Sequence, residues 1–138
     1  MTTRDKAPIE ALLDSLRRTG ESPDQAELCY LSALSAEEAT QLDKAWSDLP
    51  DGLRLDLISR LVSMAEADFA LSFGAVFRIA MCDQDAEVRK VAIEGLWEDE
   101  DVRLIPLLVR CLDEDESVVV RAAAAQSLGR FILLSRIK

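Results

Sequence analysis

Histidine is absent from this 138-residue sequence, and that absence excludes several kinds of chemistry. Without an imidazole there is no histidine acid–base catalysis, no Cys–His nucleophilic pair, and none of the usual histidine-containing zinc or iron sites. The three cysteines, Cys29, Cys82 and Cys111, are far apart and form no Cys-x-x-Cys motif, which excludes a zinc knuckle or a dithiol redox site. Because they lie within apolar helical patterns, we expect them to be buried, reduced thiols.

Long apolar runs are also missing. No segment approaches the roughly 18 consecutive apolar residues of a membrane span, and the best candidate, residues 118–125, is interrupted by Arg121. The N-terminal residues lack the apolar stretch of a signal peptide. We therefore expect a cytoplasmic protein that does not enter a membrane.

Positive charge is scarce, with 16 Lys and Arg against 26 Asp and Glu and a net charge of −10. The acidic excess lies in residues 1–100, whereas residues 101–138 are nearly neutral. Affinity for nucleic acids comes mainly from Lys and Arg, and anionic membrane surfaces attract the same residues. We expect neither a nucleic acid nor a membrane as the partner.

Only five glycines, four prolines and 5% aromatic residues leave little material for strands and β-turns. Apolar residues instead recur at helical spacing, with Gly20 placed to end the first helix and capping boxes starting at Ser22 and Ser35. The phenylalanines at positions 69, 73 and 77 fall on one helical face, which predicts core packing. The pattern predicts an all-α fold of about eight helices joined by short loops.

The chain also repeats itself. When residues 73–97 are placed on residues 105–129, a shift of 32, most positions keep their polarity. The identical pairs are Arg78/Arg110, Asp83/Asp115, Val88/Val120, Arg89/Arg121, Ala92/Ala124 and Leu96/Leu128. The pair Leu53-Arg54 matches the same frame 35 residues before Val88-Arg89. A helix–loop–helix unit of about 32–35 residues is therefore predicted.

In residues 83–96 and 113–129 an acidic turn precedes the pattern Val-Arg-x-x-Ala-x-x-x-Leu, and the second unit is preceded by Ile105-Pro106-Leu107-Leu108. These segments resemble HEAT repeats, specifically the short bacterial HEAT-like repeats of bilin-lyase type. The resemblance covers roughly residues 68–131, extends to a divergent unit at 36–66, and is absent from residues 1–34.

The resemblance implies a right-handed α-solenoid of stacked antiparallel helix hairpins. Residues 1–50 would hold N-terminal cap helices and the first helix of the first repeat, and residues 51–138 the other repeat helices. The repeat units are expected at roughly residues 36–66, 68–98 and 101–134.

In this family the arginine after the valine pairs with an aspartate of an adjacent repeat turn, which forms a ladder along the array. The resemblance gives that role to Arg89 and Arg121, with Asp83, Asp85 and Asp115 as candidate acceptors.

No residue in the sequence is a candidate for catalysis, cofactor binding or metal binding. The serines lack a nucleophile elbow, no glycine-rich phosphate loop is present, and the acidic runs 98–101 and 113–116 lack the spacing of a calcium loop. We interpret these runs as solvated charges at helix N-termini. A surface for a basic partner is the other interpretation.

We therefore expect a non-catalytic protein–protein interaction module or scaffold, whose partner is an unknown protein. In HEAT proteins the second helices form most of the binding surface, and the candidate positions are Arg60, Lys90, Glu94, Trp97, Gln126 and Arg130. Trp97 is the candidate anchor, since aromatic residues often are. The alternative is a bilin-lyase-like or other small-molecule-binding HEAT protein. The apolar residues 131–138 are expected to pack back, to continue into a longer array, or to make a self-association or partner contact.

Overall fold

The computed structural model describes the chain from residue 7 to residue 137, with side chains from residue 9 to residue 133. All of its regular elements in this range are helices, which confirms the all-α prediction. They are α1 (Ala7–Thr19), α2 (Gln25–Leu28), the 3-10 helix η2 (Cys29–Leu31), α3 (Ala36–Trp46), α4 (Asp51–Ala67), α5 (Gly74–Ala80), α6 (Ala86–Gly95), α7 (Leu104–Glu114) and α8 (Val118–Ile137).

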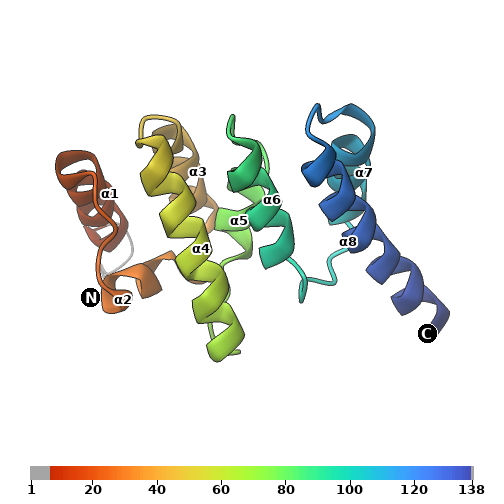
Figure 1. Ribbon diagram of the computed structural model, residues 1–138. Helices are drawn as coiled ribbons and strands as arrows, with labels where there is room; N and C mark the ends of the chain where they lie inside the picture. The colour runs from red at the N-terminus through yellow and green to blue at the C-terminus, as the bar shows by residue number, and fades with distance from the viewer. Residues whose placement is uncertain (1–6, 138) are drawn as a thin grey trace.

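The helices form an α-solenoid, in which pairs stand in a row from α1 and α2 at one end to α7 and α8 at the other (Figure 1). The second helices of three successive hairpins, α4, α6 and α8, pack side by side in one layer. The turns that join α3 to α4, α5 to α6 and α7 to α8 all lie at the same end of the hairpins. In the described part of the chain, no helix combines the length and the apolar character needed to cross a membrane.

Two of the predicted helix boundaries are confirmed. Gly20 adopts a φ of 67° directly after α1 and donates its N–H to the Leu16 carbonyl at 2.9 Å, a conformation that glycine reaches without strain. Ser35 and Glu38 form a complete capping box at the start of α3, in which each side chain accepts from the other residue's backbone N–H.

The capping box predicted at Ser22 is wrong. Helix α2 begins later, and its N-cap is Asp24, whose carboxylate accepts the Glu27 N–H at 2.9 Å. The Ser22 hydroxyl instead accepts a hydrogen bond from Arg60 Nη1 at 2.7 Å. The loop is therefore held against α4 rather than continuing the helix.

The core is one continuous cluster of mainly aliphatic side chains between the two helix layers. Phe73 and Phe77 are buried in it and meet edge to face, with ring centroids 6.4 Å apart. The prediction that Phe69 shares this face is wrong, because its side chain is 92% exposed. Helix α4 ends at Ala67, and Asp68 accepts the Ala70 N–H in a turn that breaks the helical period.

The expectation of three buried thiols is also wrong. Cys29 and Cys82 are exposed, and Cys111 is half-buried. Burial raises the pKa of the Cys111 thiol above its ordinary value.

Candidate functional site

Arg89 lies in the first turn of α6 and joins the second hairpin to the third. Its Nε and Nη2 donate to the two carboxylate oxygens of Asp115 at 2.7 and 2.8 Å, and its Nη1 donates to the Asp83 carbonyl at 2.8 Å. Such a two-pronged charge-assisted contact fixes both distance and orientation. The hydrogen bond to Asp115 raises the pKa of Arg89, and the same bond lowers that of Asp115.

A second contact of this kind, which the sequence analysis did not assign, joins the first hairpin to the second. Arg54 is buried in α4, and its Nε donates to Asp83 Oδ2 at 2.7 Å. The indole N–H of Trp46 donates to the same oxygen at 2.7 Å, and this tryptophan is buried. Burial opposes the Arg54 charge, but the hydrogen bond and charge of Asp83, followed by those of Asp51, outweigh it and raise the Arg54 pKa.

The remaining ladder residues have other roles. Asp85 is the N-cap of α6, and its carboxylate accepts the Glu87 N–H at 2.9 Å. Arg121 occupies the same position in α8 as Arg89 in α6, and its Nη1 donates to the Asp115 carbonyl at 2.7 Å. Over residues 9–133, no carboxylate lies within ion-pair distance of Arg121.

Two residues that were expected on the partner surface instead make hydrogen bonds within the protein. Arg60 holds the loop before α2 through Ser22 and the Pro23 carbonyl, both at 2.7 Å. Arg130 reaches back from α8 to the loop between α6 and α7, where it donates to the Asp99 carbonyl at 2.7 Å. Burial lowers the pKa of Arg130, although the neighbouring acidic side chains act in the opposite direction.

The other residues of that surface lie at or near the solvent. Lys90 is partly exposed and pairs with the exposed Glu94 at 3.7 Å along α6. Gln126 is exposed on α8. In the segment 131–138, Phe131 is buried and Leu133 is exposed, while the side chains from residue 134 onward lie outside the described residues.

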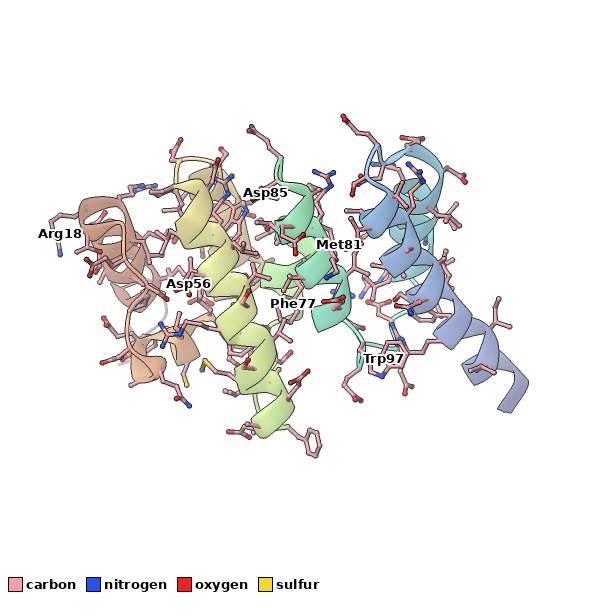
Figure 2. The ribbon with its side chains drawn as sticks, viewed as in Figure 1. Arg18, Asp56, Phe77, Met81, Asp85 and Trp97 are labelled. Carbon is pink, nitrogen blue, oxygen red and sulfur yellow. The ribbon has the colours of Figure 1, made fainter. Side chains whose placement is uncertain are left out.

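An open groove of about 710 Å³ lies at the opposite end of the hairpins from Asp85 (Figure 2). It is bordered by the end of α4, the start of α5 and the loop between α6 and α7, and we name it the Phe69–Trp97 groove. Its lining includes the side chains of Leu71, Phe73 and Phe77. Figure 2 shows Trp97 on the loop after α6, away from Asp85 at the turn end.

Two exposed aromatic side chains line this groove. Phe69 is 92% exposed and Trp97 is 54% exposed, and aromatic residues are enriched at protein–protein interfaces. The Arg130 guanidinium lies 5.3 Å from the Trp97 ring centroid and 4.5 Å from that of Phe131. Trp97 therefore already makes one cation–π contact within the molecule.

All the charged residues that line the groove are acidic: Glu66, Glu94, Glu98, Asp99 and Glu100. Asp99 is neutralised by Arg78 at 3.0 Å. Among the described side chains, no basic group lies within ion-pair distance of Glu66, Glu98 or Glu100. The groove therefore combines apolar aromatic surface with an excess of negative charge, in which Asp99 is paired with Arg78 and Glu94 with Lys90.

Comparison with protein families identifies the repeated part of the chain. A family model described as HEAT repeats matches residues 75–135, which begin within α5 and end within α8. Residues 75–135 therefore carry HEAT repeats. No curated protein and no solved structure matches the chain significantly.

The hairpin of α3 and α4 lies before the matched HEAT segment but stacks on it in the same manner. Arg54 in α4 reaches Asp83 as Arg89 in α6 reaches Asp115. The sequence contained a signal for this contact, because Leu53-Arg54 falls in the repeat frame. Asp83 follows Arg54 by 29 residues, close to the 26 residues that separate Asp115 from Arg89. Phe69 gave no such signal, since helical spacing continues through it.

Proposed function

We propose that this protein is a non-catalytic protein–protein interaction module whose Phe69–Trp97 groove binds a basic segment of a partner protein. The observation that carries the proposal is the pair of exposed aromatic rings in a groove whose charged residues are all acidic. Lys and Arg side chains suit both features, because they bind aromatic faces and pair with carboxylates. HEAT repeats commonly serve as such scaffolds, which supports the same function.

A bilin or another anionic small molecule is a weaker candidate for the groove. The propionate groups of a tetrapyrrole would meet five carboxylates and no basic lining residue. Nothing in the groove favours it over a basic peptide.

The proposal is tested with fluorescein-labelled peptides and the whole protein. We expect a short Lys- and Arg-rich peptide to raise fluorescence anisotropy saturably, and a Glu-rich peptide of equal length to leave it unchanged. Affinity should fall as salt is raised, because exposed charges are screened. Phe69→Ala should weaken binding about tenfold, because it removes an aromatic ring that contacts the peptide.

A matched pair of charge variants distinguishes binding in the groove from general attraction of a basic peptide to an acidic protein. Glu98→Gln removes one charge inside the groove, and Asp56→Asn removes one from an exposed site on α4 outside it. Glu98→Gln should weaken binding more than Asp56→Asn does. Equal effects of the two variants, or equal binding of both peptides, would contradict the proposal.

A further inference from the structure

Arg130 connects α8 to the loop that forms one wall of the Phe69–Trp97 groove. Helix α6 ends at Gly95, and backbone carbonyls at the C-terminal end of a helix favour a nearby cation. Arg130 Nη2 donates to the Leu96 carbonyl at 3.2 Å, and its Nη1 donates to the Asp99 carbonyl at 2.7 Å. One guanidinium therefore ties both ends of the segment 96–99 to α8.

The same guanidinium contacts Trp97, which lies between these two carbonyls in the sequence. It stands over the indole, 5.3 Å from the ring centroid. Trp97 lines the groove, but neither Arg130 nor any other described residue of α7 and α8 does. Arg130 therefore holds the ring from the α8 side and leaves its groove side open to a ligand (Figure 2).

The hydrogen bonding of Arg130 is incomplete, although acidic residues surround it. Its buried Nε has no acceptor among the described residues, and none of the described carboxylates lies within ion-pair distance of its guanidinium. Burial lowers the pKa of Arg130, and the charges of Asp99, Glu100 and Glu98 oppose this effect. A buried donor without a partner calls for an explanation. The contacts with Trp97 and the two carbonyls supply one, because they place the side chain for the ring and the loop rather than for an ion pair.

We infer, on the basis of the proposed function, that Arg130 is a positioning residue of the groove, which fixes Trp97 and the loop 96–99 in the arrangement that a basic peptide binds. Fixing a loop in advance strengthens binding, because less conformational freedom is lost in the complex. The charge of Arg130 acts in the opposite direction, since it repels a basic peptide and weakens the negative potential of Glu98 and Glu100. The two effects predict opposite results when the side chain is removed.

The test compares the whole protein with its variants in the anisotropy titration with the Lys- and Arg-rich peptide. Arg130→Ala should weaken binding about fivefold, because the loop is no longer fixed before the peptide binds. Arg103→Ala is the matched control, since it removes the same charge from an 87% exposed side chain at the start of α7. It should leave binding unchanged or slightly stronger. If Arg130→Ala does not fold, Arg130→Lys keeps the charge but lacks the planar group and should also weaken binding.

Acrylamide quenching of tryptophan fluorescence reports the position of Trp97 without any peptide. Trp46 is buried and shielded from the quencher, so a change in quenching reports on Trp97. Arg130→Ala should raise quenching by up to about twofold, because the ring is already 54% exposed and loses the guanidinium over one face. Arg103→Ala should leave quenching unchanged.

Two results would overturn this inference alone: binding of the peptide by Arg130→Ala that is as tight as in the wild type or tighter, or quenching that Arg130→Ala leaves unchanged. Absence of peptide binding by the wild type would instead overturn the proposed function, and the inference with it.

Discussion

Replacing Arg54 with alanine should destabilise the protein far more than the equivalent change at Arg121. In the wild type, Arg54 neutralises Asp83, whose carboxylate is completely buried. Its removal leaves that charge with only the Trp46 indole and one backbone N–H. Breaking a buried pair in this way costs about 3–5 kcal/mol, a large part of the stability of a small domain.

The equivalent alanine variants at Arg89 and Arg121 are expected to destabilise the protein less than Arg54→Ala. The Arg89 and Asp115 side chains keep 15% and 8% exposure, so water partly compensates the orphaned carboxylate and Arg89→Ala should cost less than Arg54→Ala. Arg121→Ala removes one described hydrogen bond to a carbonyl and should cost about 1 kcal/mol. The expected order of destabilisation is therefore Arg54, Arg89, Arg121.

Urea unfolding followed by circular dichroism measures this order, because the chain is helical throughout its described length. If Arg54→Ala does not fold, Arg54→Lys keeps the charge but loses the two-pronged geometry and should give an intermediate loss. Equal destabilisation by the Arg54 and Arg121 variants would refute the reasoning, since only the first leaves a buried carboxylate unpaired.

Three further outcomes are expected. The pKa of Asp115 in the folded protein lies below its ordinary value of 3.8, so its pairing with Arg89 stabilises the protein above pH 3.8. This stabilisation is lost as the pH falls through the pKa of the folded protein. The difference in free energy of unfolding between the wild type and Asp115→Asn, measured with urea, should therefore become smaller below pH 3.8. Gly95→Ala should lower the stability measured by thermal unfolding by about 1–2 kcal/mol, because its new Cβ would lie 2.7 Å from the Phe77 ring. Gly52→Ala should not destabilise the protein, because its new Cβ has nothing within 4 Å. Ellman's reagent should modify two cysteines quickly and Cys111 slowly, and three equal rates would contradict the assigned burial.

Periodicity and the repeat frame were sufficient to predict the helices and the hairpin stacking. Apolar residues at helical spacing must bury one face, so they indicate where α3 to α8 lie. The same frame placed Arg54 in register with Arg89. The buried contacts of Arg54, however, depend on the folded chain bringing Leu49, Asp51 and Asp83 around its guanidinium.

Apolar spacing could not locate the exposed aromatic groove. Phe69 continues the helical spacing, and only the turn at Asp68 takes it out of the core. Arg60 and Arg130 were expected on the surface, but carbonyls far away in the sequence bind them. Such contacts leave no local pattern, because they depend on where loops from other repeats pass.

The emission of Trp97 during titration with a Lys- and Arg-rich peptide tests most directly whether the groove binds a basic partner. The other tryptophan, Trp46, is buried and hydrogen-bonded to Asp83, so a spectral change reports on Trp97. A saturable change that weakens with salt and is absent with a Glu-rich peptide is predicted. An unchanged spectrum while the same peptide binds, or an equal change with both peptides, would contradict the proposed function.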